Sequence, residues 1–234
     1  MSQAVISLNQ GRTWTVGSIG GPADLADTSA ETARRSCDVV EIRLDLLADG
    51  NGAVDPGSWS HLCGLPLLFT ARRRDEGGAL DLDAGRRGEL LKTALPDAAM
   101  VDIEVASIGE MQAVIAMLEV PWIASFHHFD HLPETTVLEE AARRAKAAGA
   151  AAFKAAARVH TPADLARLAE FQLADHGLPV ATMGMGPLAP VSRLLCAQCR
   201  SVLNYGFLGN QPTAPGQWDA AFLTEAIRRL APLI

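Results

Sequence analysis

One lysine in this sequence lies in a setting that favours covalent chemistry. Lys154 is surrounded by small apolar residues in the run 150–157, although seventeen of the twenty basic residues in the chain are arginine. A lysine buried among apolar side chains can lose its proton, which an arginine does not, and a neutral amine attacks carbonyl carbon. The setting therefore predicts a nucleophile for a carbonyl substrate. The alternative is a structural lysine paired with Asp102 or Glu104.

Charged residues recur at alternate positions near the ends of two apolar segments. Glu41, Arg43 and Asp45 form one set, and Asp102 and Glu104 form the other. Alternate residues of a strand point to the same face, so the members of each set are predicted to share a face. Their acids could pair with arginines inside the protein. They could instead bind a divalent metal together with a histidine.

Two adjacent histidines end another apolar segment. His127 and His128 would point to opposite faces of a strand, so one of them is expected to face the site. An imidazole there could act as an acid and a base near neutral pH, or either ring could be a hydrogen-bonded core histidine. Glu41, Glu76 and Glu104 could serve as paired acids of a glycoside hydrolase, but one tyrosine and four tryptophans offer few surfaces for stacking sugars.

Two further motifs match known binding sites only in part. Residues Gly184–Ala189 imitate the dinucleotide fingerprint G-x-G-x-x-A, but no acid occurs between Asp175 and Asp219 to hold the ribose. We expect a close-approach loop that opens the next helix. Cys196 and Cys199 have the spacing of metal ligands, but no second pair or nearby histidine completes a set of ligands. Ordinary thiols are therefore expected.

The composition is that of a packed protein whose partners are not polyanions. The chain has 49% apolar and 20% charged residues, which excludes wholesale disorder. Its 27 acidic and 20 basic side chains give a formal charge of −7, which argues against nucleic-acid and membrane partners, because both need a basic face. The sequence shows no secretion signal and no long apolar run, and its four cysteines do not indicate a disulfide framework. A cytoplasmic protein is therefore predicted.

Eight apolar, β-branched segments alternate with amphipathic segments along almost the whole chain. The predicted strands are Trp14–Ile19, Val39–Asp45, Pro66–Arg72, Met100–Val105, Trp122–His127, Ala152–Ala156, Val180–Met185 and Val202–Phe207. The predicted helices are Asp24–Ser36, Asp83–Leu95, Ile108–Leu118, Pro133–Ala148, Pro162–His176, Val191–Arg200 and Asp219–Leu230. The segment Asn51–Gly64 is expected to hold a short helix at most.

This alternation predicts a (β/α)8 TIM barrel that occupies residues 1–234 as a single domain. Ala4–Leu8 and the turn Asn9–Gly11 are predicted to form an N-terminal β-hairpin that closes the barrel bottom. Barrel enzymes carry their chemistry at the carboxyl ends of the strands. The charged residues, the histidines and Lys154 all fall near those ends, so one site is expected there.

The ordered motifs resemble those of type I 3-dehydroquinate dehydratase, the Schiff-base class of the shikimate pathway. The resemblance covers nearly the whole chain and rests on Glu41-x-Arg43-x-Asp45, Phe69-Thr70-x-Arg72-x-x-x-Glu76-Gly77-Gly78, Ser125-Phe126-His127, Lys154, Val191-Ser192-Arg193-Leu194 and Pro212-Thr213-Ala214-Pro215-Gly216-Gln217. It implies a lyase that converts 3-dehydroquinate to 3-dehydroshikimate by syn elimination of water. It also implies that no metal or organic cofactor is needed, and that the enzyme is a homodimer.

The resemblance implies a role for each matching residue. Lys154 is similar to the imine-forming lysine, His127 to the general acid and base, and Glu76 to the carboxylate that orients and tunes that histidine. The substrate-contacting positions match Glu41, Arg43 and Arg72, the carboxylate-binding arginine matches Arg193, and the loop over the substrate matches Thr213 and Gln217.

Three positions depart from the family's pattern. His128 stands where an acid is common, Thr213 replaces a serine, and the stretch 155–158 replaces a bulkier apolar one. None of these changes removes an acid, a base or a nucleophile. The alternatives are another imine-forming lyase such as an aldolase on the same barrel, a metal-dependent sugar isomerase, and a non-catalytic paralogue that binds a shikimate-like metabolite.

Overall fold

The computed structural model describes residues 6–9, 12–49 and 52–230. In this part of the chain, eight strands alternate with helical segments, as the sequence predicted. The strands are β1 (Trp14–Ile19), β2 (Val39–Arg43), β3 (Leu67–Thr70), β4 (Met100–Glu104), β5 (Trp122–His128), β6 (Ala152–Arg158), β7 (Val180–Met185) and β8 (Leu203–Leu208).

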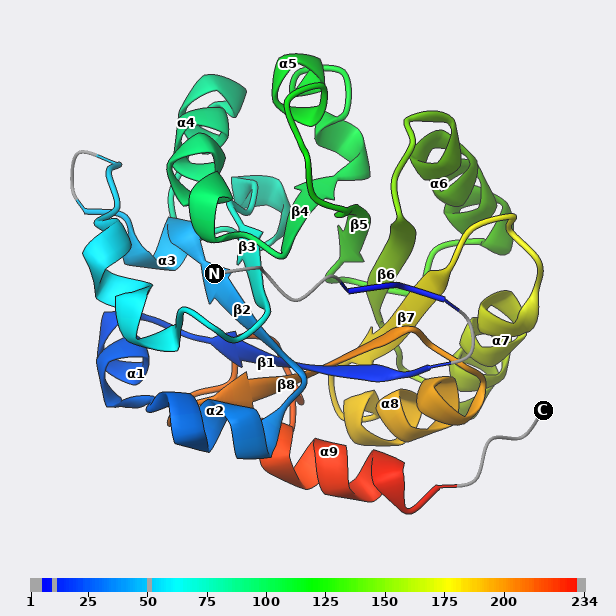
Figure 1. Ribbon diagram of the computed structural model, residues 1–234. Helices are drawn as coiled ribbons and strands as arrows, with labels where there is room; N and C mark the ends of the chain where they lie inside the picture. Colours follow the sequence, from blue (N-terminus) through cyan, green and yellow to red (C-terminus); the bar gives the residue numbers. More distant parts are fainter. Residues whose placement is uncertain (1–5, 10–11, 50–51, 231–234) are drawn as a thin grey trace.

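Helices connect the carboxyl end of each strand to the start of the next and surround the strands (Figure 1). The α-helices are α1 (Pro22–Asp27), α2 (Ala30–Ser36), α3 (Leu44–Leu47), α4 (Ala84–Ala94), α5 (Gln112–Ile115), α6 (Thr135–Ala147), α7 (Pro162–Leu173), α8 (Ala189–Gln198) and α9 (Ala220–Arg228). Short 3₁₀ turns are η1 (Pro56–Leu62), η2 (Arg74–Glu76), η3 (Leu95–Asp97) and η4 (Val105–Ser107).

The strands form one parallel sheet that curves into a barrel. Its order is β7-β6-β5-β4-β3-β2-β1-β8, and the two ends come together where the Val202 N–H donates to the Val180 carbonyl at 3.1 Å. The (β/α)8 barrel is therefore confirmed. All strands are parallel, so their carboxyl ends lie at one rim, where a barrel places its chemistry.

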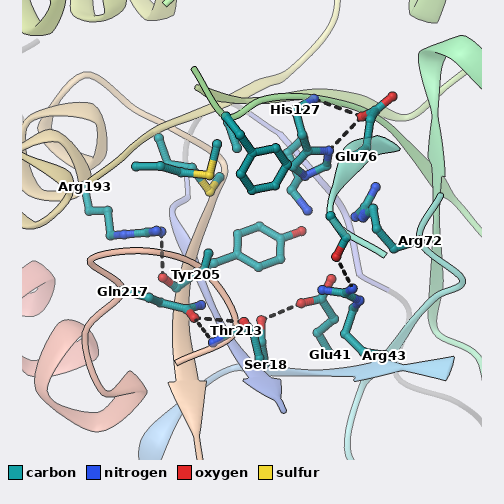
Figure 2. A pocket seen from close by; sticks show the side chains of 17 residues that line it. Ser18, Glu41, Arg43, Arg72, Glu76, His127, Arg193, Tyr205, Thr213 and Gln217 are labelled. Atoms are coloured by element: carbon teal, nitrogen blue, oxygen red, sulfur yellow. Dashed lines mark hydrogen bonds and ion pairs between the residues drawn. The ribbon is translucent and has the colours of Figure 1, made fainter. Parts of the chain in front are cut away.

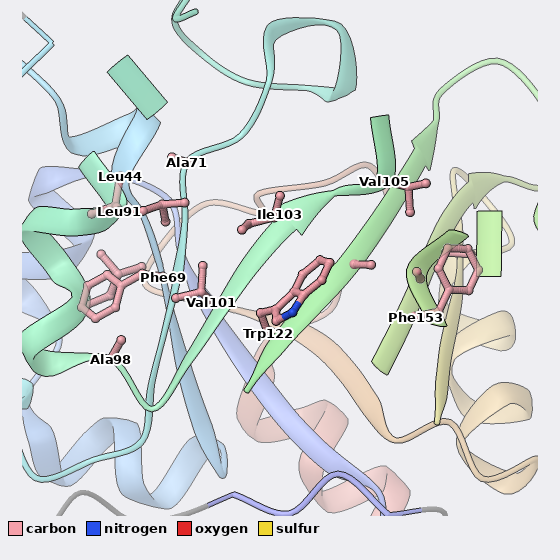
Figure 3. Packing of buried hydrophobic residues seen from close by; sticks show 14 of the residues in the cluster. Leu44, Phe69, Ala71, Leu91, Ala98, Val101, Ile103, Val105, Trp122 and Phe153 are labelled. Atoms are coloured by element: carbon pink, nitrogen blue, oxygen red, sulfur yellow. The ribbon is translucent and has the colours of Figure 1, made fainter. Parts of the chain in front are cut away.

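Alternation along the strands divides the core into two layers. Outward-facing side chains such as Phe69, Val101 and Phe153 pack against the helices (Figure 3). Inward-facing side chains such as Leu68 and Met183 fill the barrel interior. Because residues two apart share a face, the inward positions that follow toward the carboxyl ends are free to carry polar groups.

Some boundaries differ from the predicted ones, each for a local reason. The helix predicted at Asp24–Ser36 is two helices, because the Ser29 hydroxyl accepts the Thr32 N–H at 3.1 Å and starts α2 anew. The helix predicted at Ile108–Leu118 is reduced to α5, since Gly109 weakens helix formation.

Strand β2 ends two residues before the predicted limit. Asp45 belongs to α3, where its carboxylate accepts the backbone N–H groups of Arg72 at 3.2 Å and Ala79 at 3.0 Å. Asp45 therefore does not continue the strand face of Glu41 and Arg43, and that part of the prediction was wrong.

The predicted N-terminal hairpin, Ala4–Leu8 followed by Asn9–Gly11, falls mostly outside the described residues. Its described part, residues 6–9, forms no strand. Across the described ranges, no helix is long and apolar enough to cross a membrane.

Candidate active site

A cavity opens at the carboxyl ends of the strands (Figure 2). It spans about 580 Å³ free of atoms, a volume that includes open solvent. All nine residues that the sequence predicted for the site line it: Glu41, Arg43, Arg72, Glu76, His127, Lys154, Arg193, Thr213 and Gln217. The barrel thus brings residues that are far apart in the sequence to one place.

Lys154 lies on β6 with 3% of its surface exposed. Its Nζ is 3.0 Å from Oδ2 of Asp102 on β4, as the structural alternative expected, and its side chain also lines the cavity. Asp102 accepts the Ser125 hydroxyl and is 3.0 Å from Arg72 Nη2. Burial opposes ionisation of Asp102, but the charges of Arg72 and Lys154 outweigh it and hold its pKa well below the usual range. The amine is therefore held by a carboxylate that stays ionised.

His127, on β5, forms a hydrogen-bonded pair with Glu76, at the end of η2. Glu76 Oε2 is 2.9 Å from both Nδ1 and the backbone nitrogen of His127. Burial lowers the pKa of His127 well below 6.5, and the charges of Arg72 and Lys154 lower it further. Burial also raises the pKa of Glu76 from 4.5 to about 7, against the opposing charge of Arg72. The imidazole is therefore neutral at neutral pH and can accept a proton.

A buried ion-pair network lies behind this pair. Arg72 Nη1 donates to Glu104 at 3.0 Å, and Arg87 of α4 donates to the other Glu104 oxygen at 2.9 Å and to Ser107 at 3.0 Å. The sequence reasoning missed Arg87, because an arginine in an amphipathic helix usually faces solvent. The acids of β4 thus pair with buried basic groups. No group of three or more potential metal-ligating side chains occurs in the part of the chain that the structure describes.

Glu41 and Arg43 form the β2 side of the cavity. Glu41 accepts the hydroxyls of Ser18 and of Thr70, the latter at 2.9 Å. Arg43 donates from Nε and Nη2 to the two oxygens of Asp45 at 2.8 and 2.7 Å. Burial opposes ionisation of Asp45, but the hydrogen bonds and charge of Arg43 lower its pKa. These contacts fix both β2 side chains before any ligand arrives.

Arg193, on α8, is a buried cation without an acidic partner in the described residues. Only 1% of its surface is exposed, its Nη1 donates to the Tyr205 carbonyl at 2.8 Å, and its Nε has no hydrogen-bond partner there. Burial lowers its pKa from 12.5 to about 10. A buried charge without a counter-charge is unfavourable, so this guanidinium would gain from a bound anion.

Thr213 and Gln217 follow β8 in a segment that reaches over the cavity. The backbone N–H and the hydroxyl of Thr213 donate to Gln217 Oε1 at 2.9 and 2.8 Å. Gly216 between them has φ +76°, and an added Cβ would collide with the carbonyl of Gly186. The Gly186 N–H donates to the Pro215 carbonyl at 3.1 Å. The segment is therefore closed on itself and packed against the turn after β7.

The cavity also has lining residues that the sequence reasoning did not single out. They are Ser18, Gly77, Phe129, Ala156, Met183, Met185, Tyr205 and Ala214. The period of two could have found some of them, since Ala156 follows Lys154 on the same face of β6. Tyr205 on β8 was not identified from the sequence, because an aromatic residue in a strand usually belongs to the core.

Three features weighed in the sequence lie apart from the cavity's polar groups. The His128 ring packs against His131 with 4.1 Å between centroids, so His127 alone of the pair faces the cavity. The turn within Gly184–Ala189 opens α8, and a Cβ at its first glycine would come within 2.7 Å of an α8 side chain, as a close-approach loop requires. Cys196 and Cys199 are free buried thiols.

A cavity at the carboxyl ends of eight barrel strands, lined by a buried lysine and a histidine–carboxylate pair, is the arrangement of a TIM-barrel enzyme. Comparison with known proteins is more specific. The sequence model of type I 3-dehydroquinase matches residues 20–232, and the chain belongs to that family.

Individual relatives agree with this assignment. The 3-dehydroquinate dehydratase of Methanocella arvoryzae is 33% identical over 207 residues, which cover 87% of this chain and 92% of the relative. That of Haloquadratum walsbyi is 34% identical over 221 residues, 89% of either chain. The crystal structure of 3-dehydroquinate dehydratase from Geobacillus kaustophilus HTA426 has a TM-score of 0.82 at 24% identity and covers 93% of this chain and 91% of its own. At this level of identity, the similarity to the crystal structure supports the fold alone.

Proposed function

We propose that this chain dehydrates 3-dehydroquinate to 3-dehydroshikimate, in the shikimate pathway, through a Schiff base on Lys154. The observation that carries the proposal is that one cavity holds the Lys154 amine, the His127–Glu76 pair and Arg193. A cyclic ketone with a carboxylate matches this set, because the amine reacts with the ketone and the guanidinium binds the acid. Membership in the type I 3-dehydroquinase family supports the same substrate.

The first step is condensation at C3. Nζ of Lys154 attacks the carbonyl carbon as the free amine, and the resulting carbinolamine hydroxyl takes the proton that Nζ gave up and leaves as water, which gives a protonated imine. The carboxylate of Asp102, which lies 3.0 Å from Nζ in the free protein, can balance the positive charge of that imine. The imine withdraws electrons from the ring and makes the hydrogen on C2 acidic.

The second step is a syn elimination by His127. The imidazole takes the C2 proton, and the electrons of that bond form an enamine. The enamine then expels the C1 hydroxyl, which receives the proton from His127 and leaves as water. Glu76, 2.9 Å from Nδ1, holds the tautomer that leaves Nε2 as the base. Hydrolysis of the imine releases the conjugated product and restores Lys154.

The remaining site residues position the ring. Arg193 binds the carboxylate, preferably through two parallel hydrogen bonds. Glu41, Arg43 and Arg72 contact the hydroxyls on the opposite side, where their own ion pairs and hydrogen bonds fix them. Thr213 and Gln217 belong to the segment over the cavity and close on the substrate.

The proposal is tested by trapping the intermediate. Addition of 3-dehydroquinate should produce the ultraviolet absorbance of a conjugated enone, and borohydride should reduce the imine to a stable adduct. Peptide mapping should place the adduct on Lys154. Turnover without a trappable adduct, or an adduct on Lys92 or Lys146, would overturn the mechanism.

A matched pair of variants separates the site lysine from the others. Lys154→Met should abolish both turnover and trapping, whereas Lys92→Met, on the exposed Lys92–Glu89 pair of α4, should retain both. Activity should also survive a chelator, since every step above uses side chains. Loss of activity in chelator would favour a metal-dependent isomerase instead.

We further propose a homodimer that works in the cytoplasm, with the chain folded as a single domain. The homodimer follows from the family resemblance, and the four unpaired cysteines fit a reducing compartment. Light scattering at micromolar concentration should give twice the 24.8 kDa chain mass. A monomer mass would contradict the oligomeric proposal and leave the reaction untouched.

A further inference from the structure

Tyr205 lines the cavity together with Arg193, Arg43 and Glu41 (Figure 2). Its ring lies under Lys154, with 4.2 Å from Nζ to the ring centroid, and its backbone carbonyl accepts a hydrogen bond from Arg193 Nη1 at 2.8 Å. The residue is 3% exposed and lines the cavity. The ring and the backbone therefore both have partners in the site.

The hydroxyl of Tyr205 has no such partner. Its Oη is buried and makes no hydrogen bond within the described residues. The nearby acids are already engaged, since Glu41 accepts Ser18 and Thr70 and Asp102 accepts Lys154 among others. A buried hydroxyl without a partner is destabilising.

A phenylalanine would avoid this penalty. It would keep the ring under Lys154 and the backbone carbonyl that Arg193 uses, because neither contact involves the hydroxyl. The hydroxyl is therefore the one polar part of the Tyr205 side chain, and it has no partner among the described residues. Its position among the cavity-lining side chains points to a ligand atom as the missing partner.

We infer that the Tyr205 hydroxyl binds a ring hydroxyl of the substrate that the reaction retains. The inference rests on the proposed function, in which Arg193 takes the carboxylate, Lys154 the C3 carbonyl and His127 the C1 hydroxyl. The hydroxyls at C4 and C5 remain on the product, and each can accept a hydrogen bond from Tyr205 in addition to a contact with Glu41, Arg43 or Arg72. Tyr205 therefore selects for a ring that carries them. Separately, burial raises the pKa of Tyr205 well above 10, so the phenol keeps its proton and can donate.

Tyr205→Phe is the direct test, because it removes one oxygen and keeps the ring. We expect KM for 3-dehydroquinate to rise about 3- to 10-fold, the size of one hydrogen bond, with a smaller change in kcat. The thermal midpoint should stay the same or rise, since the oxygen has no hydrogen-bond partner in the part of the chain that the structure describes. A purely structural tyrosine would show the reverse pattern, a lower midpoint with KM unchanged.

Thr182→Val is the matched control. Thr182 is fully buried on β7, and its hydroxyl donates to Gln172 Oε1 at 2.8 Å outside the cavity. Loss of this oxygen should lower the thermal midpoint and leave KM unchanged. The two variants together distinguish a hydroxyl that binds substrate from a hydroxyl that stabilises the fold.

Substrate analogues complete the experiment. The parent enzyme should discriminate in kcat/KM between 3-dehydroquinate and its 4-deoxy or 5-deoxy analogue, and Tyr205→Phe should lose a large part of one discrimination. If the parent converts 3-dehydroquinate, and Tyr205→Phe has the same KM and the same discrimination as the parent, the inference is overturned and the proposed function stands. A parent that does not convert 3-dehydroquinate would overturn the proposed function, and the inference with it.

Discussion

The imidazole of His127 and the carboxylate of Glu76 have pKa values displaced in opposite directions by the same buried setting. Burial lowers the pKa of His127 below 6.5 and raises that of Glu76 to about 7. The ionised Glu76 accepts the Nδ1 proton and leaves Nε2 as the base, whereas a protonated Glu76 does not fix that tautomer. The catalytic state of the pair should therefore form as the pH rises through about 7.

Glu76→Gln should remove this pH dependence. We expect kcat to fall by at least about tenfold, because general acid–base catalysis contributes roughly 10²–10⁴-fold, and the rise of kcat/KM near pH 7 should flatten. Asp75→Asn, at the neighbouring exposed carboxylate, should keep the rise. The measurement is the pH profile of kcat/KM from about pH 5 to 9. A rise that persists in Glu76→Gln would assign it to another group.

Arg193 is a buried cation that has no acidic partner within the described ranges. Arg193→Lys should raise KM by about 10- to 100-fold, since an ammonium cannot form two parallel hydrogen bonds to a carboxylate. Unfolding in urea should change little, because Nη1 is the one donor of Arg193 with a hydrogen-bond partner among the described residues. Arg143→Lys on the exposed face of α6 is the matched control and should alter neither quantity. An unchanged KM in Arg193→Lys would contradict the carboxylate role.

The segment after β8 positions side chains through its backbone. Gly216 has φ +76° and lies against the turn after β7, so Gly216→Ala should displace Thr213 and Gln217 together. We expect KM to rise several-fold, with stability lower by about 1–3 kcal/mol for the strained backbone. Gly109→Ala meets no atom within 4 Å and should leave KM unchanged. Equal KM values for the two variants would exclude a role of the segment in binding.

The elements show which parts of the structure the sequence determines locally. Strand periodicity and apolar content predicted all eight strands, and β1 and β7 agree at both ends. Helix breaks were harder to predict, because Ser29 starts α2 through a side-chain contact that periodicity does not record. The end of β2 was also missed, since Asp45 leaves the strand to bind N–H groups of the next loop.

Some residues of the candidate site could be identified from the sequence, and others could not. Motif residues such as His127 and Lys154 were identifiable from their neighbours and from the family resemblance, and all nine line the cavity. Arg87 and Tyr205 were not identified, because their significance depends on contacts between distant segments. Arg87 becomes important through Glu104 of another element, and Tyr205 through an oxygen that nothing in the described residues contacts.

The whole molecule has a formal charge of −7, whereas several of the side chains that line the cavity are basic. The cavity gathers Arg43, Arg72, Lys154 and Arg193, but the first three are paired with buried acids. Only the last lacks such a partner among the described residues. We therefore expect the site to select a small molecule that carries one anionic group.

The buried acids also determine how the fold responds to pH. The pKa of Asp45 is lowered from 3.8, and that of Asp102 is lowered as well. Each contributes stability that is present above about pH 4 and is lost as the pH falls through the folded pKa. The raised pKa of Glu76 acts oppositely, since its contribution is present at low pH and is lost as the pH rises through about 7. Maximum stability is therefore expected between these limits.

Asp45→Asn should lower the acid sensitivity of the fold. The free energy of unfolding should drop by about 3–5 kcal/mol at neutral pH, because Arg43 is left as a buried charge without its partner. The loss of stability between about pH 5 and 2 should be smaller than in the parent, since one of the groups that take up a proton on unfolding is gone. Urea unfolding across that range measures both effects, with Asp130→Asn at an exposed position as the control. A parent whose stability is constant from pH 5 to 2 would show that these carboxylates keep their ordinary pKa values in the fold.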